Sequence, residues 1–400
     1  MFKSIRYVTQ YVCLSPGSAN WSVRPQFNFE YICFQHCPDH TLHKFNELLY
    51  PWYQLNQREL PWRSVSDPYL IWVSETILQQ TRVSQGLDYY RRFVNRFPDV
   101  NSLAGTHEDE LMKVWEGLGY YSRARNMHEA AQNIVRVYKG VFPNQYDEIL
   151  KLKGVGEYTA AAVASIAFGL PYAVVDGNVS RVMARYFGIS EAVNTTNGQR
   201  LVREAANELL KSSLKSIHTG IHNQAVMELG ALVCTPKNPG CGICPVAESC
   251  HANLKKMTGM LPVKNKNLKR SVKYFNFLVI EYDGAYFIEK RTSPGIWKNL
   301  YQFPLVETPS ELADDEIINL PEVRQIIVRS GSSIVNISQV YKHVLTHRDI
   351  YARFIYIRTS GVLFTRKNFF KVNKEEISNF AFPVLITNYL RKSGILPDNR

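Results

Sequence analysis

The sequence predicts two domains of different structural class, a helical domain followed by a smaller α+β domain. Two changes in pattern predict this division. Apolar residues recur with helical spacing between residues 43 and 232, and with the two-residue spacing of strands after residue 271. Between these parts, residues 262–271 are polar, basic and without a period, which is typical of a linker. We therefore expect domains over 41–261 and 272–400, preceded by an extension of little regular structure over 1–40.

The composition favours a polyanionic partner and a reducing compartment. The chain of 400 residues has a net charge of +12, and lysine and arginine gain from counterion release at a phosphate backbone. A basic soluble protein without such a partner is the alternative. Four of the seven cysteines cluster late in the chain, which indicates metal ligation rather than a disulfide framework. With no apolar run of membrane-spanning length and no clean secretory leader, we expect a cytoplasmic monomer that is neither secreted nor membrane-bound.

A helix predicted over 68–82 holds the first candidate catalytic residue. It follows a helix over 43–56 and an extended elbow over 60–63, and Asp67-Pro68 is a typical helix start. Its apolar residues lie on nearly every side, as in a buried helix, and Glu75 lies in its middle. A carboxyl group buried among apolar side chains has a raised pKa, keeps its proton and can act as a general acid. The alternative is a glutamate on a solvated stripe, which the neighbouring residues disfavour.

Three further helices are expected over 89–97, 108–116 and 123–138, with a loop at 117–121. The loop holds two glycines and two tyrosines, so its backbone can approach another molecule closely and offer a ring for stacking. Stacking of a base on an aromatic ring is worth roughly 1–3 kcal/mol. A tyrosine pair in the core is the alternative.

A glycine-rich hairpin over 152–157 joins helices predicted over 144–152 and 157–168. Its glycines let the backbone turn and expose N–H groups at a helix N-terminus, which binds phosphate oxygens without reading base sequence. A short extended run over 172–175 then leads to Asp176, where a helix containing Arg181 and Arg185 begins. Asp176 is a candidate catalytic residue and a candidate N-cap, and the two roles are compatible.

Amphipathic helices are predicted over 195–212 and 223–232, and the second runs into a cysteine cluster over 234–250. Zinc is the metal that four cysteine thiolates generically bind, and an iron–sulfur cluster is the alternative. Zinc sites typically use two C-x2-C pairs, whereas the spacing here contains one such pair. An iron–sulfur cluster is therefore favoured, with the ligands Cys234, Cys241, Cys244 and Cys250.

Beyond the linker, a β-hairpin is expected from strands over 274–282 and 285–291 around Asp283-Gly284. Further strands are predicted over 333–341, 350–358 and 361–364, and a helix over 383–392. These elements predict an α+β domain.

Residues 43–395 resemble the adenine DNA glycosylases, which excise adenine mispaired with 8-oxoguanine and belong to the helix-hairpin-helix superfamily of endonuclease III. The resemblance implies an all-α helix-hairpin-helix domain with a cluster loop, followed by a nudix-like α+β domain. It rests on the four cysteines and on several motifs in the same order, namely LPWR at 60–63, SETILQQT at 74–81, GLGYY at 117–121, GVGEYTA at 154–160 and DGNV at 176–179.

The family resemblance also implies roles for individual residues. Glu75 would protonate the adenine leaving group, and Asp176 would stabilise or covalently trap the sugar cation. Tyr158 and Asn178 would orient the charged transition state. The adenine would leave the base stack to reach this site. The cysteines would hold a [4Fe–4S] cluster, and the residues expected to contact DNA are Arg63 at the base pocket, Gln80, Thr81, Leu118 and Tyr120 at the 8-oxoguanine, and Lys153, Gly154, Val155 and Gly156 in the hairpin.

Other features refine the resemblance. Endonuclease III-type relatives carry a nucleophilic lysine where this chain has Tyr158, which predicts base removal without strand cleavage. The second domain lacks the nudix hydrolase box, which favours binding over hydrolysis. Where the family has Phe-Ser-His, this chain has Leu345-Thr346-His347, so Thr346 and His347 are the candidates for 8-oxoguanine contact. Lys153 stands where relatives often have proline and would add a phosphate contact.

The expected partner is double-stranded DNA containing adenine opposite 8-oxoguanine or guanine, in the nucleoid of a bacterium. Two alternatives remain. One is another mismatch or oxidised-pyrimidine glycosylase of the same superfamily, and the other is a non-catalytic DNA-binding iron–sulfur protein. A buried acid at Glu75 disfavours the latter, because a binding module has no need of one.

Overall fold

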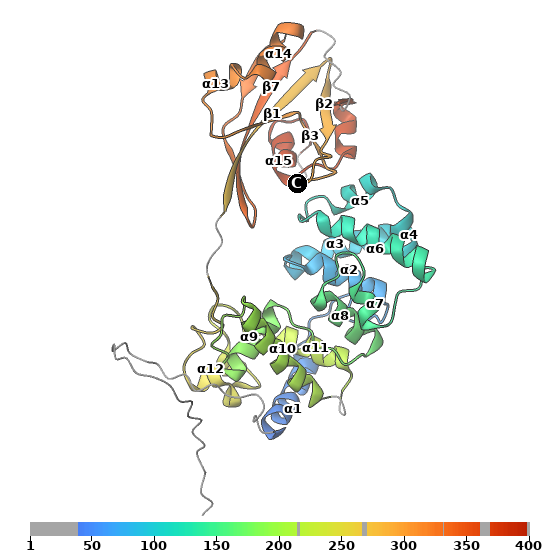
Figure 1. The fold of residues 1–400 in the computed structure, drawn as a ribbon, viewed down its shortest axis with the longest axis vertical. Coiled ribbons are helices and arrows are strands. Elements are labelled where there is room, and N and C mark those ends of the chain that lie inside the picture. The colour runs from blue at the N-terminus through green and yellow to red at the C-terminus, as the bar shows by residue number, and fades with distance from the viewer. Residues whose placement is uncertain (1–38, 214–216, 266–269, 331, 361–368, 398–400) are drawn as a thin grey trace, which may run out of the picture.

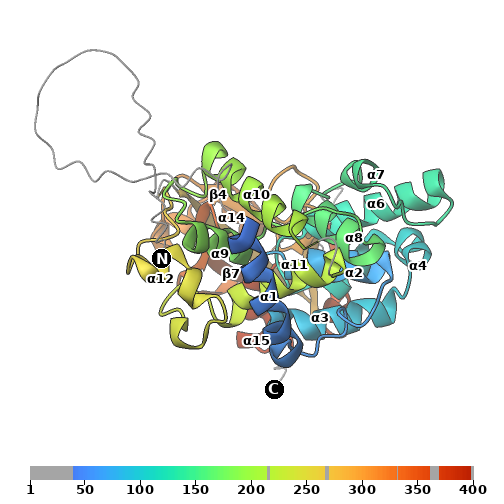
Figure 2. The ribbon, with the colours of Figure 1, turned by 90° about the horizontal axis from the view of Figure 1, so that it is seen from below.

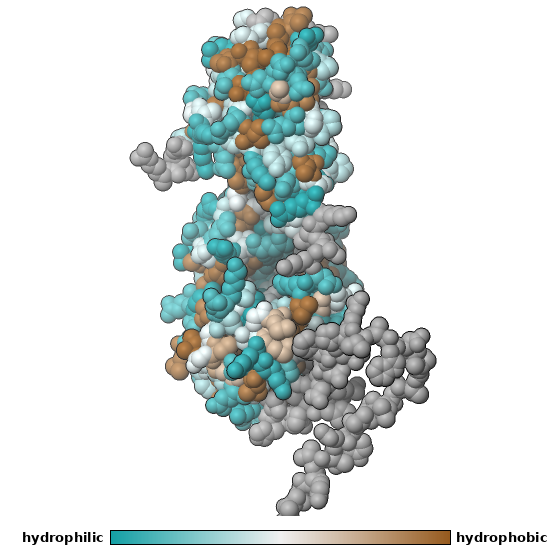
Figure 3. All heavy atoms as spheres, turned by 90° about the vertical axis from the view of Figure 1, so that its left-hand side faces the viewer, coloured by the Kyte–Doolittle hydropathy of each residue, from teal (hydrophilic) through white to brown (hydrophobic). Residues whose placement is uncertain are grey.

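The computed structural model describes residues 39–213, 217–265, 270–330, 332–360 and 369–397. They form a helical domain and an α+β domain that lie one above the other along the long axis (Figures 1 and 3). Most of the extension expected over 1–40 and the whole strand expected over 361–364 lie outside the described residues. None of the helices in the described ranges combines the length and apolar character that a bilayer span requires.

The helical domain has two lobes, each with its own apolar core. The first lobe contains α2–α8 and the second contains α1 and α9–α12 (Figure 1). In the second lobe α1 packs against α10 and α11 (Figure 2). The helices are α1 (Asp39–Asn56), α2 (Pro68–Leu78), α3 (Val83–Arg96), α4 (Val100–Gly105), α5 (Glu108–Trp115), α6 (Ser122–Tyr138), α7 (Tyr146–Leu150), α8 (Glu157–Phe168), α9 (Gly177–Phe187), α10 (Thr196–Lys211), α11 (Thr219–Leu232) and α12 (His251–Leu254).

Helix α2 is buried as predicted, but it ends at Leu78 rather than at residue 82. The sequence has no glycine or proline at this point to stop it. The Nη1 atom of Arg123, on α6, lies 2.9 Å from the carbonyl oxygen of Thr76 and 3.0 Å from that of Ile77. It also reaches the Gln79 carbonyl, and Gln80 then adopts a φ of 57°. Because a distant guanidinium satisfies the last carbonyls, the helix ends where local sequence signals do not predict an end.

The second domain is built on one mixed sheet, in which β1 and β7 are parallel neighbours at its centre. Alternate residues of β1 face opposite cores: Phe275 and Phe277 pack on the side of α15, and Leu278 and Ile280 on the side of α13 and α14. The strands are β1 (Ser271–Tyr282), β2 (Ala285–Lys290), β3 (Tyr301–Gln302), β4 (Leu305–Thr308), β5 (Ser333–Ile337), β6 (Tyr341–Val344), β7 (Arg348–Arg358) and β8 (Phe369–Asn373), and the helices are α13 (Asp314–Ile318), α14 (Pro321–Ser330) and α15 (Val384–Lys392).

Most predicted elements of this domain are present, but the extent of one predicted strand is wrong. The stretch 333–341, predicted as one strand, forms β5 and the start of β6, which pair with different parts of β7. A break at 338–340 separates them, and the Ser338 hydroxyl there accepts the Phe354 N–H at 2.9 Å. The short strands β3, β4 and β8 and the helices α13 and α14 were not predicted from the sequence, because their apolar runs are too short to show a period.

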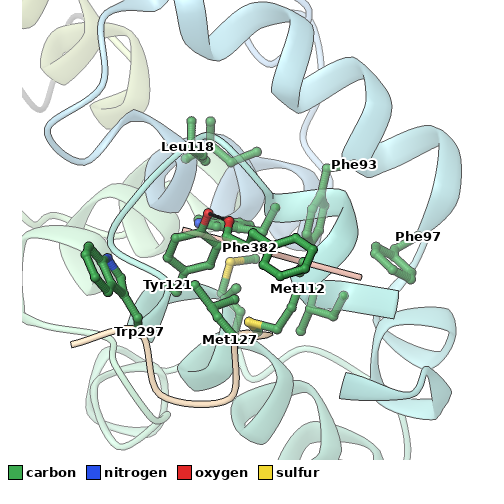
Figure 4. Packing of buried hydrophobic residues seen from close by; sticks show 14 of the residues in the cluster. Phe93, Phe97, Met112, Leu118, Tyr121, Met127, Trp297 and Phe382 are labelled. Atoms are coloured by element: carbon green, nitrogen blue, oxygen red, sulfur yellow. Dashed lines mark hydrogen bonds between the residues drawn. The ribbon is translucent and has the colours of Figure 1, made fainter. Parts of the chain in front are cut away.

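The two domains share an apolar core. Met112, Leu118, Tyr121 and Met127 of the helical domain pack against Trp297 and Phe382 of the second domain (Figure 4). At the edge of this core, the Glu116 carboxylate accepts the Phe382 N–H at 3.1 Å. A contact with both an apolar centre and a polar rim fixes the position of the second domain on α5 and α6.

We expect Arg123→Met to lower the free energy of unfolding by about 2 kcal/mol, because several buried carbonyl groups would lose their charged donor. Arg136→Met is the matched control, since it makes the same change on an exposed face of α6. Urea denaturation of both variants measures the difference. Equal midpoints would contradict the role assigned to Arg123.

Candidate active site

The candidate catalytic residues line one cavity of about 190 Å³ between the two lobes of the helical domain. Glu75 on α2 and Tyr158 on α8 come from the first lobe, and Asp176 and Asn178 come from the second. Arg63 and Thr81 also line this cavity. The structure therefore brings together residues that are more than 100 positions apart in the sequence.

Glu75 lies in the last turn of α2 and is 7% exposed. Its Oε2 atom accepts a hydrogen bond from the Tyr158 hydroxyl. Burial raises the pKa of Glu75 to about 7, although the hydrogen bond from Tyr158 and the charge of Arg63 act in the opposite direction. The negative charge of Asp176 adds to the rise. Near neutral pH this carboxyl group can therefore carry a proton and donate it.

Asp176 is the N-cap of α9, as one of its two predicted roles requires. Its Oδ1 atom accepts the Val179 N–H at 2.7 Å, and its Oδ2 atom accepts from the Asn178 amide at 2.7 Å. Arg181 in turn donates to Asn178 Oδ1 at 2.9 Å. Burial raises the pKa of Asp176 above its usual value, and the hydrogen bonds from Val179 and Asn178 oppose that rise. The capping bonds fix the direction in which the carboxylate points.

The segment before Asp176 was expected to be strand-like. Residues 172–175 form no strand in the structure. Their backbone is held instead by α11, where Asn223 Oδ1 accepts the Val174 N–H at 3.1 Å.

The glycine-rich hairpin lies at the start of α8 and has the predicted form. Gly154 has a φ of 76°, and a Cβ atom there would come within 2.5 Å of Asn126. Both facts require glycine at this position. Val155 is buried, and Gly156 is the N-cap of α8. The Lys153 side chain is 56% exposed and its Nζ atom lies 3.7 Å from Glu129, so it is accessible to a phosphate.

The residues expected at the 8-oxoguanine side lie on two turns. Gln80 and Thr81 follow α2, and Gln80 lines a second cavity, of about 790 Å³, together with Tyr158 and Asp176. In the 117–121 loop, Leu118 and Tyr121 are buried whereas Tyr120 is 46% exposed. The two interpretations of the tyrosine pair thus apply to different rings, since Tyr121 is in the core and Tyr120 is available for stacking.

Thr346 and His347 are exposed in the turn between β6 and β7. The Thr346 hydroxyl forms a hydrogen bond with the Tyr120 hydroxyl. The second domain therefore meets the exposed tyrosine of the first domain directly.

The sequence analysis missed two charged residues that line the cavity, Arg58 and Glu228. Glu228, on α11, is fully buried and accepts hydrogen bonds from the guanidinium groups of Arg58 and Arg63. A signal was present, because Glu228 is an acidic residue in the apolar run 225–233. The same pattern identified Glu75.

The four cysteines lie in a loop with two short 3-10 turns, η2 (Cys241–Ile243) and η3 (Ala247–Ser249), between α11 and α12. All four thiols are free and half-buried. Cys234, Cys244 and Cys250 pack against the core of the second lobe. The Arg185 guanidinium lies 3.4 Å from Cys234 Sγ, where it would offset negative charge on a ligated thiolate.

These residues fit an iron–sulfur cluster. Burial raises the pKa of Cys244 to about 11, and the charges of the three other cysteines also raise it. A thiolate at Cys244 would therefore be stabilised by a bound cation. No three His, Cys, Asp or Glu side chains in the described ranges are grouped closely enough to hold a single metal ion. Residues 234–250 match the iron-sulfur binding domain of endonuclease III, and this match identifies the cofactor as a [4Fe–4S] cluster.

Further comparisons with known proteins cover both domains. Residues 73–212 match the HhH-GPD superfamily of base excision DNA repair proteins, and residues 276–392 match the NUDIX domain. The chain is 33% identical to the adenine DNA glycosylase of Buchnera aphidicola (subspecies Baizongia pistaciae) over 349 residues, which cover 85% of this chain and 94% of that protein. It is 40% identical to the adenine DNA glycosylase of Homo sapiens over 217 residues, which cover 52% of this chain and 39% of that protein.

A solved structure of a thermostable thymine-DNA glycosylase is similar with a TM-score of 0.49 and 29% identity, covering 54% of this chain and 98% of that one. The helical domain, its hairpin and its cluster loop define a base excision repair glycosylase of the helix-hairpin-helix class. Similarity along almost the whole of the Buchnera protein narrows this class, and the chain belongs to the adenine DNA glycosylases. It is a DNA-binding hydrolase that cleaves the glycosidic bond of adenine.

Proposed function

We propose that this enzyme removes adenine opposite 8-oxoguanine or guanine, with Glu75 as general acid and Asp176 as the group that stabilises the sugar cation. The observation that carries the proposal is a buried carboxyl group of raised pKa in one cavity with a second, capped carboxylate. In the first step the proton of Glu75 moves to the adenine ring, and the glycosidic electron pair leaves with the base. Asp176 then balances the positive charge of the sugar until water adds to it.

Tyr158 and Asn178 would orient these two groups. Tyr158 donates to Glu75, and Asn178 donates to Asp176, so each carboxyl group has a neutral partner that limits its motion. Because Tyr158 has no amine, the sugar would form no Schiff base with the protein. We therefore propose that the enzyme leaves the DNA strand intact.

The surfaces around the cavity would hold the rest of the DNA. The hairpin at 153–156 would bind a phosphate through N–H groups at the start of α8, and Arg63 would line the pocket for the flipped adenine. Gln80, Thr81, Leu118 and Tyr120 would contact the opposite base. Thr346 and His347 would contact an 8-oxoguanine there, since both are exposed and Thr346 touches Tyr120.

We propose boundaries at 41–261 for the glycosylase domain and 272–400 for the lesion-recognition domain, joined by the linker 262–271. The division is supported by α12, which ends at Leu254, and by α1 and β1, which begin at Asp39 and Ser271, close to the proposed boundaries. We also propose that the enzyme acts as a monomer in the bacterial nucleoid. On the one face drawn in Figure 3, hydrophobic residues lie among hydrophilic ones, so this face does not have the character of a dimer interface.

Glu75→Gln is expected to lower the single-turnover rate of adenine excision by at least about 100-fold, since amides do not supply the proton. Binding of the duplex should be retained, because the change is isosteric. In the wild type the rate should fall as pH rises through about 7, where Glu75 loses its proton. It should also fall at acidic pH, starting above the usual range of an aspartate, where Asp176 gains one. A rate that stays constant from about pH 6 to about pH 9 would contradict the assignment of Glu75 as the acid.

Substrate choice is tested with duplexes that hold A opposite 8-oxoguanine, A opposite G, and T opposite G. We expect excision from the first two and none from the third. Thr346→Val should slow excision opposite 8-oxoguanine more than opposite G, because guanine lacks the oxygen that Thr346 would contact. Activity confined to the third duplex would overturn the proposed substrate.

Borohydride trapping tests the absence of strand cleavage. With Tyr158 in place, we expect no accumulation of a covalent protein–DNA adduct while free adenine is released. An endonuclease III-type enzyme with its lysine nucleophile is the positive control. Abundant adduct in the wild-type protein would show a Schiff base and contradict the prediction.

A further inference from the structure

Glu228 forms an ion-pair network that the catalytic proposal does not use. Its Oε1 atom accepts from Arg58 Nε at 2.9 Å and from Arg63 Nη1 at 2.9 Å. Its Oε2 atom accepts from Arg58 Nη2 at 2.6 Å and from Arg63 Nη2 at 2.7 Å. The Arg58 backbone N–H also donates to Oε1 at 2.9 Å. One carboxylate therefore binds two guanidinium groups, each through two nitrogen atoms.

The network is buried beside the catalytic carboxyl groups. Glu228 has no exposed surface, the Arg63 side chain is 13% exposed, and both line the cavity that contains Glu75. Burial alone would raise the pKa of Glu228, but the hydrogen bonds from Arg58 and Arg63 outweigh it and hold the pKa at about 2. Glu228 is thus ionised throughout the pH range in which the enzyme would work.

Two cations next to a protonated acid create a conflict. A guanidinium group that pairs directly with a carboxyl group lowers its pKa by about 1–3 units and holds it ionised. If Arg63 turned towards Glu75, the proposed general acid would lose its proton at neutral pH. The groups that act on Glu75 are Tyr158 from α8, Asp176 from the start of α9, and Arg63, with Arg58 and Glu228 behind Arg63. Arg63 is the cation in this set that acts on Glu75 directly.

We propose that Glu228 is a positioning residue that occupies both guanidinium groups, keeps Arg63 at the cavity wall, and so leaves the Glu75 carboxyl group free to carry its proton. This inference rests on the proposed role of Glu75. It gives α11 a function in catalysis, although Glu228 itself need not touch the substrate. The network also keeps the cavity open for the base, because Arg63 is fixed along one side by two bonds to Glu228 and by a third, at 3.0 Å, to the Arg58 carbonyl.

The test is the pH dependence of single-turnover adenine excision in Glu228→Gln. The freed Arg63 should pair with Glu75, so the decline of the rate on the alkaline side should move to lower pH by about one unit or more. At pH values above this decline, we compare the rate divided by the rate at low pH. This ratio should be about tenfold lower in Glu228→Gln than in the wild type. A purely structural defect would lower the rate equally at every pH, and the position of the decline does not depend on how much protein folds.

Two further variants complete the test. Arg63→Met combined with Glu228→Gln removes the cation as well, and the decline should return to the wild-type pH or above it. Glu228→Asp keeps the charge and protects the fold but cannot reach both guanidinium groups fully, so a smaller shift in the same direction is expected. A decline at the wild-type pH in both single variants, or a downward shift that persists in the double variant, overturns the inference. Glu75→Gln separates the two proposals: if it retains excision, the acid assignment fails, whereas an inactive Glu75→Gln with an unshifted Glu228→Gln refutes only the role of Glu228.

Discussion

The buried carboxyl group of Glu75, with a pKa raised to about 7, is the feature on which the proposed active site depends. The chain carries a net charge of +12, which attracts DNA, yet positive charge near a carboxyl group drives its proton away. Burial in α2 counteracts this by removing the carboxyl group from water, and the neutral hydroxyl of Tyr158 makes the direct contact. A lysine at this position would contact Glu75 with a charge. Tyrosine at position 158 therefore suits the proposed acid catalysis as well as the proposed absence of a Schiff base.

The position of the site between two cores follows from the same constraint. Each lobe packs its own apolar residues, so each presents a rigid wall to the cavity. The first lobe supplies Glu75, the proposed acid, and its tyrosine, and the second supplies Asp176, which the start of α9 holds by two hydrogen bonds. Because the two carboxyl groups belong to different lobes, their hydrogen-bond partners differ, although the charge of Asp176 also contributes to the raised pKa of Glu75. The loop between α1 and α2 crosses from one lobe to the other and carries Arg58 and Arg63.

Local patterns predicted most of the helices, the hairpin, the central strands, and Glu75 and Asp176 as candidate catalytic residues, because these depend on the spacing of apolar residues and on residue types at turns. The short helices α4 and α12 were not predicted, and Tyr158 and Asn178 were named only through the family resemblance. Contacts between distant residues were not predicted. The end of α2 depends on Arg123, and the fixed position of Arg63 depends on Glu228, which lies 165 residues further along the chain. Glu228 pairs with distant arginines, and the local bond of Arg123 to the Gly119 carbonyl does not indicate that the same guanidinium group also reaches α2. The strands β5 and β6 were predicted as one, because the bend between them depends on a bond from Ser338 to β7.

The second domain reaches the catalytic helix through a continuous set of contacts rather than through the linker. Thr346 meets Tyr120, the loop of Tyr120 is held by Arg123 through the carbonyl of Gly119 at 3.2 Å, and Arg123 also binds the end of α2 just beyond Glu75. Each link is a hydrogen bond, and the shared core around Tyr121 and Phe382 keeps the domains from sliding past each other. A base that displaced Thr346 from Tyr120 would therefore act on a loop with a direct attachment to the acid-bearing helix. In the proposed mechanism, recognition of the lesion and protonation of the adenine would share a structural support at Arg123.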